Sequence, residues 1–190
     1  GSENTAVGTA ALDANTTGAN NIGMGYAALG ANTTGTRNVA IGSNNGALTT
    51  NTTGSDNVAV GADALYLNTT ASNNTAVGRS ALGANTTGAG SVAVGKSALG
   101  SNTTGAENTA VGLSALVLNT TGTQNVAFGS SALDACTTGD FNTAIGTSAL
   151  GAVTTSDYNT AVGRNAGTAI TTGANNTFVG GLAGDGTDDG

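Results

Sequence analysis

The side chains that could carry out chemistry are few and far apart in this sequence. The 190-residue chain has one cysteine, Cys136, no histidine, 11 acidic residues and four basic residues. A catalytic nucleophile needs a neighbouring base, and a metal ion needs a group of His, Cys, Asp or Glu ligands. Neither set can be assembled, so we expect no catalytic, cofactor-binding or metal-binding residues, no cofactor, and a protein that is not an enzyme.

Three short motifs resemble known sites only weakly. Gly23-Met24-Gly25 has the G-x-G spacing of a phosphate loop, and 184–190 (G-D-G-T-D-D-G) has the composition of a calcium loop. We interpret the first as part of a repeat and the second as a solvated tail. Asn-Thr-Thr triplets match the glycosylation pattern, but a repeat explains them better and an inward Asn could not carry a sugar; they start at Asn15, Asn32, Asn51, Asn68, Asn85, Asn102 and Asn119, with Asn-Asn-Thr matches at Asn73 and Asn175.

The composition excludes several classes of protein. Charged residues make up 8% of the chain, against about 25% in an ordinary domain. The net charge of −7 argues against a nucleic-acid partner, which needs clustered Lys and Arg. No apolar run approaches the roughly 20 residues of a membrane-spanning helix, and no signal peptide is apparent, so we expect a mature or excised piece. Cys136 has no partner for an internal disulfide.

One 17-residue unit repeats along nearly the whole chain. It reads N-[TV]-A-V-G-x-S-A-L-x-A-N-T-T-G-x-x, and we number its positions 1 to 17. Only the unit 38–56 is longer, by two residues within 43–46. We expect one repeat array over 1–183 and an acidic, glycine-rich tail over 184–190. Position 1 falls at Asn4, Asn21, Asn38, Asn57, Asn74, Ser91, Asn108, Asn125, Asn142, Asn159 and Asn176.

The repeat favours short strands over helices. Seventeen residues are about 4.7 helical turns, so a helix would rotate each apolar face away from the previous one. The N-T-A-V and N-T-T segments suit strands, and the glycines at positions 5 and 15 suit corners. The sequence therefore predicts an all-β parallel solenoid of about eleven coils, spaced about 4.8 Å apart, in a rod roughly 50 Å long.

Charge placement predicts which positions face water. In the ten full units every charged residue falls at position 6, 7, 10, 16 or 17. Because buried unpaired charge is costly, these positions should be exposed corners. Position 12 is Asn in seven units and then Cys136, Val153 and Ile170. It should point inward and form a ladder of stacked amides, with position 1 as a second ladder.

Packing considerations predict an oligomer. We expect Val at position 4 and Leu at position 9 to fill the interior of each coil, which is a small core for a lone rod. Alanine at position 3 lies on the opposite face of the strand from position 4. A face restricted to small residues indicates close approach of another chain, most simply around the axis of a homotrimer. Phe178 is too large for such a contact, so we expect the axis to open or be plugged there.

The phrases N-V-A-I-G (38–42) and S-V-A-V-G-K-S-A-L (91–99) resemble the head repeats of YadA-like trimeric autotransporter adhesins. They are also similar to repeat arrays of phage and bacterial tail fibres. The resemblance covers about residues 1–181 and implies a left-handed β-roll, three chains around an axis, and an extracellular place on a bacterial surface or virion. It also implies a non-catalytic role in binding a host or matrix surface molecule, protein or glycan. The unit of 17 residues is longer than the roughly 14 of those heads, and we expect no neck, stalk or anchor within these 190 residues.

These observations leave two functions to weigh. The first is a structural and adhesive fibre segment. The alternative is an ice-binding solenoid, because Thr at positions 13 and 14 repeats in all ten full units. Adjacent strand residues face opposite sides, so only one of these two rows could be flat and exposed.

Overall fold

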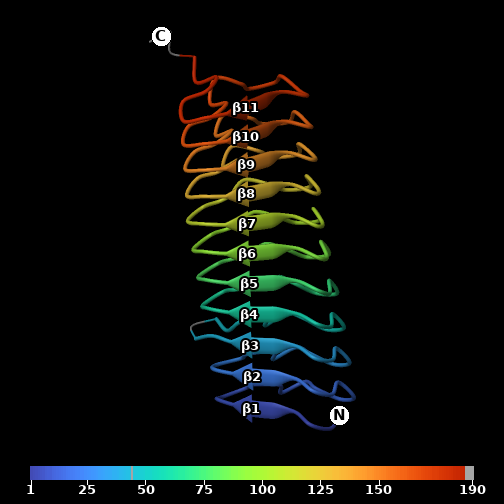
Figure 1. The fold of residues 1–190 in the computed structure, drawn as a ribbon. Helices are drawn as coiled ribbons and strands as arrows, with labels where there is room; N and C mark the ends of the chain where they lie inside the picture. Colours follow the sequence, from blue (N-terminus) through green and yellow to red (C-terminus); the bar gives the residue numbers. More distant parts are fainter. Residues whose placement is uncertain (44, 187–190) are drawn as a thin grey trace.

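In the part of the chain that the structure describes, eleven three-residue strands lie one above another in a single parallel sheet (Figure 1). The computed structural model describes residues 1–43 and 45–186. Within them no helix is long and apolar enough to cross a membrane. The strands are β1 (Thr5–Val7), β2 (Ile22–Met24), β3 (Val39–Ile41), β4 (Val58–Val60), β5 (Thr75–Val77), β6 (Val92–Val94), β7 (Thr109–Val111), β8 (Val126–Phe128), β9 (Thr143–Ile145), β10 (Thr160–Val162) and β11 (Thr177–Val179).

Each strand occupies positions 2 to 4 of one repeat and pairs in register with the same positions of the next. Ala93 on β6, for example, is opposite Ala110 on β7. Between β3 and β4 the register step is 19 residues, Val39 against Val58, and the parallel pairing is the same as elsewhere in the sheet. Each repeat is therefore one coil, and the predicted parallel β-solenoid is confirmed.

The corners of each coil depend on left-handed backbone. Gly112 at position 5 has a φ of 134°, and a Cβ there would lie 2.5 Å from the carbonyl oxygen of Gly129 in the next coil. Glycine is needed at this corner for both reasons. Positions 7, 9 and 17 also have positive φ, as at Ser114, Leu116 and Glu107. A leucine in this conformation is strained by about 1–2 kcal/mol, which complete burial of its side chain offsets.

The interior contains the residues of positions 3, 8 and 9, which corrects one prediction. Ala110, Ala115 and Leu116 are fully buried. Val111, which we expected inside, lies on the outer face of β7. The strand alternation was right, but the assignment of its two faces was wrong. Alanine at position 3 is small because Ala at position 8 and Leu at position 9 of the same narrow coil pack against it, so it provides no argument for a second chain.

Two asparagine amides close a coil wherever positions 1 and 12 are both Asn. In the second coil, Nδ2 of Asn21 (position 1) and Nδ2 of Asn32 (position 12) both donate to the carbonyl oxygen of Gly35, at 2.9 and 3.0 Å. Asn32 Nδ2 also donates to Asn15 Oδ1 of the coil before, at 2.9 Å. Asn21 Oδ1 accepts from the backbone N–H of Asn38 at 3.0 Å. Both predicted asparagine ladders are confirmed.

The Asn-Thr-Thr segments do not form the predicted second strand. The backbone N–H groups of Thr86 and Thr87 both donate to the carbonyl oxygen of Thr103, at 2.9 and 3.3 Å. Two consecutive N–H groups that point at one acceptor cannot alternate as in a pleated strand. These segments are bends joined from coil to coil, so the coil has one strand and one sheet.

The interior changes composition toward the C-terminus. Cys136 is fully buried at position 12, where we expected a small core residue. Its Sγ lies 3.7 Å from the carbonyl oxygen of Gly139 and does not reach Asn119, whose Oδ1 is buried without a partner. Phe178, at position 3 of β11, packs on the core beside Gly167 and Gly184, where a Cβ would lie within about 3 Å of its ring. It fills the space left by two missing leucines and does not face an external axis.

Replacement of Asn85 by leucine tests the ladder at its middle. Asn85 Nδ2 donates to Asn68 Oδ1 and to the Gly88 carbonyl, and Asn85 Oδ1 accepts from Asn102. Asn85→Leu leaves these buried groups without partners, and we expect a loss of about 3 kcal/mol in the free energy of unfolding. Denaturant titration measures it. The control is Thr87→Ala in the same coil, expected within about 0.5 kcal/mol of the parent; equal effects of the two variants would show that the ladder is not needed.

Burial raises the pKa of the Cys136 thiol to about 11, from 9.0. Because the folded chain holds the thiol proton more tightly than the unfolded chain, this contribution to stability is complete below about pH 9 and is lost as the pH rises toward about 11. At about pH 8 we expect no reaction of the folded chain with a chromogenic disulfide reagent and one thiol per chain after unfolding. Between about pH 8 and pH 10.5 the unfolding midpoint should fall more for the parent than for Cys136→Ala. Rapid labelling of the folded chain would contradict this assignment.

Candidate binding surfaces

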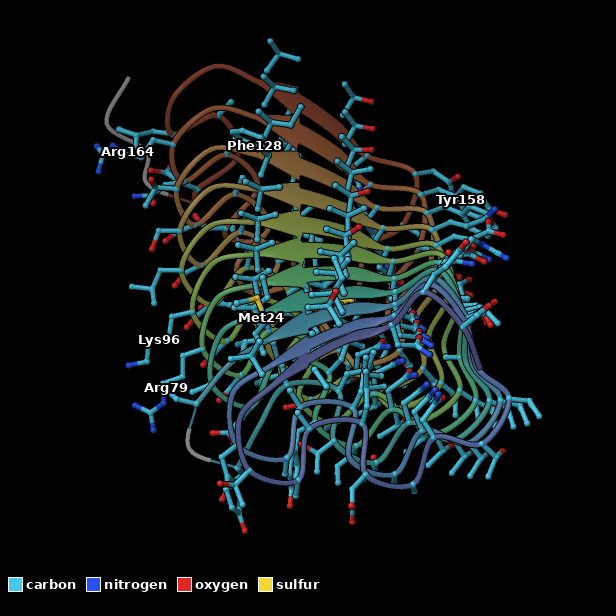
Figure 2. The ribbon with its side chains drawn as sticks, turned by 90° about the horizontal axis from the view of Figure 1, so that it is seen from below. Met24, Arg79, Lys96, Phe128, Tyr158 and Arg164 are labelled. Carbon is cyan, nitrogen blue, oxygen red and sulfur yellow. The ribbon has the colours of Figure 1, made fainter. Side chains whose placement is uncertain are left out.

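The outer face of the sheet carries one continuous apolar row. Position 4 is always Val, Ile, Met or Phe, whereas position 2 is Val or Ile in five of the described strands and Thr in the other six. Met24 and Phe128 project from this face (Figure 2), with 39% and 55% of their surface exposed. Because the side chains of a strand alternate, filling the interior with Ala at position 3 turns both neighbours outward.

A row of ten threonines at position 14 is exposed along the Asn-Thr-Thr bends. The row at position 13 is different: Thr86 Oγ1 donates to the carbonyl oxygen of Thr103 at 3.0 Å, and Thr103 Oγ1 donates to that of Thr120 at 2.9 Å. These hydroxyls are half-buried and used by the coil. Only the position 14 row is exposed through the middle of the rod, as expected, but the reason is different: the segment is not a strand, and the position 13 hydroxyls are turned to the neighbouring coil.

The charged residues lie at the corners, as predicted. None of those in the described part of the chain is buried. Arg79, Lys96 and Arg164 project from position 6, the corner that follows the sheet (Figure 2). Arg37 and Asp56 lie at position 17 of successive coils and form a bidentate ion pair, with Nε to Oδ1 at 2.6 Å and Nη2 to Oδ2 at 2.8 Å. The hydrogen bond from Arg37 lowers the pKa of the Asp56 carboxyl; exposure makes the pair a small contributor to stability.

The corner at positions 16 and 17 carries an aromatic pair. Its Tyr158 projects on the other side of the sheet from Arg79 and Lys96 (Figure 2). Phe141 and Tyr158 occupy position 17 of successive coils and stack face to face, with ring centroids 4.9 Å apart and planes within 5°. Their surfaces remain 42% and 55% exposed. Each follows an aspartate at position 16, Asp140 or Asp157.

Those two aspartates are fixed by the neighbouring coils. Asp140 Oδ1 accepts from the backbone N–H of Thr123 at 2.6 Å and from its hydroxyl at 3.0 Å. Asp157 Oδ1 accepts from the backbone N–H of Asp140 at 2.8 Å. Within residues 1–43 and 45–186, neither Oδ2 atom has a hydrogen-bond partner. One oxygen of each carboxylate is therefore structural and the other is available.

The weak motifs behave as the repeat predicts. Gly23 is buried on β2, and the N–H of Gly25 donates to the carbonyl oxygen of Val7, so this segment makes coil contacts and no phosphate loop. Apart from the first, half-buried Asn15, the asparagines of the Asn-Thr-Thr triplets are fully buried with their amides bonded. Asn73 and Asn175 are exposed at position 17. Part of the tail motif, 187–190, lies outside the described residues.

The described residues offer surfaces rather than a cavity. No pocket is found among them, and no three His, Cys, Asp or Glu side chains in residues 1–43 and 45–186 come together as a metal site. Such a molecule can bind by contact along a face or a corner. Sequence reasoning missed the outward apolar face and the aromatic pair. The recurrence of D-F (140–141) and D-Y (157–158) exactly one repeat apart was the available signal for the pair.

Comparison with protein-family models, with curated proteins and with solved structures finds no match to this chain. The arrangement of its own residues is therefore what bears on its function.

Proposed function

We propose that this chain is a non-catalytic segment of an extracellular structural and adhesive fibre, on a bacterial surface or a virion. In this proposal three copies associate through the outer faces of their sheets, and the exposed corners meet a host or matrix surface molecule. The observation that carries it is the outer sheet face, whose position 4 row is apolar in all eleven described strands and whose position 2 row adds Val or Ile in five of them.

An apolar strip of that length is unusual on the surface of a single soluble chain. In the middle of the rod, Val94 and Val111 are partly exposed on the outer face, whereas the preceding Ala93 and Ala110 point into the core and are fully buried. Covering the strip removes apolar side chains from water, and a second copy presents the same flat, regularly spaced face. The resemblance to trimeric adhesin heads favours three copies around one axis over two.

The remaining surfaces suit a fibre that displays residues. The corners hold the variable and charged side chains, while the interior and the asparagine ladders are nearly the same in every coil. In a rod of this kind the interior residues hold the coils together and the corner residues are free to contact a partner, because a corner residue can change without disturbing the stack. This agrees with an adhesive role and with the lack of any pocket in the described part of the chain.

Ice binding is the second candidate, and the exposed threonine row at position 14 favours it. The neighbouring row weakens it, because the position 13 hydroxyls donate to backbone carbonyls of the next coil. One row of free hydroxyls provides a narrow surface on which to order water. We expect no thermal hysteresis in solutions of the folded chain; a clear hysteresis that Thr87→Lys with Thr121→Lys abolishes would favour ice binding instead.

Sedimentation of the intact chain tests the assembly. We expect a species of three times the 17.9 kDa chain mass. Val94→Lys with Phe128→Lys places two charges on the outer face, two coils apart, and burial of these charges between chains is too costly for the trimer to persist. This double variant should sediment as single chains with an unchanged circular dichroism spectrum.

The matched control is Thr87→Lys with Thr121→Lys, which adds the same charges at the same spacing on the threonine row. It should remain trimeric. A parent chain that sediments as a monomer, or a Val94→Lys, Phe128→Lys variant that remains trimeric, would contradict association through the outer sheet face.

A further inference from the structure

We infer that the stacked pair of Phe141 and Tyr158 is a docking site for a cationic side chain, an arginine of a partner polypeptide. The inference rests on the proposed role of the rod in presenting a binding surface, and it names the chemistry of one such surface. It begins from the concentration of aromatic residues: the chain has three Phe, three Tyr and no Trp. Two of these six lie together on one exposed corner.

The backbone conformation at these two positions is unfavourable for an aromatic side chain. Both Phe141 and Tyr158 have a φ of 58°, where bulky side chains are uncommon. The other residues at position 17 are polar or glycine, such as Asn73, Gly90 and Gln124. Stacking of the rings recovers about 0.5–1.5 kcal/mol, yet both residues remain exposed to water. Strain combined with exposed apolar surface is typical of a binding position.

The charges around the pair select the ligand. Asp140 and Asp157 adjoin the rings, and each has an available Oδ2 because Oδ1 is used by the neighbouring coil. Glu107 lies two coils below Phe141 in the same row, where its Oε2 accepts from Gln124 Nε2 at 2.8 Å. The four Lys and Arg residues lie elsewhere: three at the position 6 corner, and Arg37 six coils away in its pair with Asp56. This corner is therefore aromatic and negative.

A guanidinium group fits both features. It stacks on the face of an aromatic ring, to which the ring quadrupole attracts its charge, and its N–H groups pair with carboxylate oxygens. One face of the Tyr158 ring stacks on Phe141. The other face is on the side of the next coil, where the residue at position 17 is Asn175, which has a shorter side chain. A neutral ligand would use the rings but leave the negative charge uncompensated, so charge complementarity favours the cation.

Titration with two matched peptides tests the site. The probes are a blocked hexa-arginine peptide and its neutral isostere, hexa-citrulline, followed by calorimetry and tyrosine fluorescence at low salt. Hexa-arginine should bind more tightly than hexa-citrulline by about fivefold or more. In Phe141→Leu with Tyr158→Leu this preference should fall about fivefold. Leucine is a fair replacement because this fold already holds leucine at positive φ, as at Leu116.

Two further variants separate the site from general attraction of cations. Tyr26→Ala removes another exposed tyrosine, 58% accessible at the position 6 corner, and should change binding by less than about twofold. Asp140→Asn with Asp157→Asn retains an oxygen for the structural hydrogen bonds but removes the charge. It should weaken hexa-arginine binding and flatten its salt dependence.

Equal binding of the two peptides, equal loss in Tyr26→Ala, or unchanged binding in the double leucine variant would overturn the inference. So would a neutral glucan hexasaccharide that perturbs Tyr158 fluorescence where hexa-arginine does not. Sedimentation of the same samples tests the sheet face independently. A monomeric chain that prefers hexa-arginine would refute only the assembly, and a trimer without that preference would refute only the docking site.

Discussion

The carbonyl oxygen of position 15, held by two asparagine amides, is the contact on which the rest of the structure depends. Gly122 shows it: Asn108 Nδ2 and Asn119 Nδ2 donate to its oxygen at 2.7 and 3.0 Å. These contacts close the coil across its width. The coil is also joined to the coil before, because the backbone N–H of Asn108 donates to Ser91 Oγ and Asn119 Nδ2 donates to Asn102 Oδ1. A seventeen-residue coil whose apolar interior side chains are only Ala and Leu has little apolar area to bury. Its order therefore depends on satisfied polar groups in a dry interior, where each is costly to leave unpaired.

The need to pair every buried polar group explains why the interior residues hardly vary from coil to coil, and it explains where they do vary. A ladder in which each amide donates backward leaves its last oxygen without a donor. Asn119 Oδ1 is that atom, since Cys136 in the next coil has no amide to offer. After it, Val153 and Ile170 continue the position as apolar residues, and Phe178 replaces the missing leucines. The C-terminal coils thus change from an amide-bonded interior to an apolar one.

Much of this fold follows from the sequence. The second strand expected at Asn-Thr-Thr does not form. The period, the parallel stacking of in-register units, the inward Asn ladders and the exposed corners were predictable, because charge and amide chemistry restrict where those residues can lie. The face assignment of Ala110 and Val111 was not. Apolar size argues for valine inside, and only the width of the folded coil shows that alanine fits there. The positive φ of Leu116 was not predictable either. The intrinsic preference of leucine is for negative φ, and burial of the side chain in the folded coil overrides that preference. The aromatic pair can be recognised in the sequence, because its two residues are one repeat apart. The exposure of the two rings cannot be predicted from the sequence.

The corners are where such a rod can acquire specificity, and the fold restricts how it does so. Side chains at one position of successive coils are about 4.8 Å apart, close enough to stack or pair. A binding feature is therefore most easily built from one residue type repeated in consecutive coils, or from two that complement each other. Arg37 with Asp56 uses the position 17 row to satisfy charge within the chain. Phe141 with Tyr158 uses the same row and leaves ring faces and carboxylate oxygens unsatisfied. One geometry thus produces a closed pair in one part of the rod and an open pair in another, and the open pair is the one with capacity for a partner.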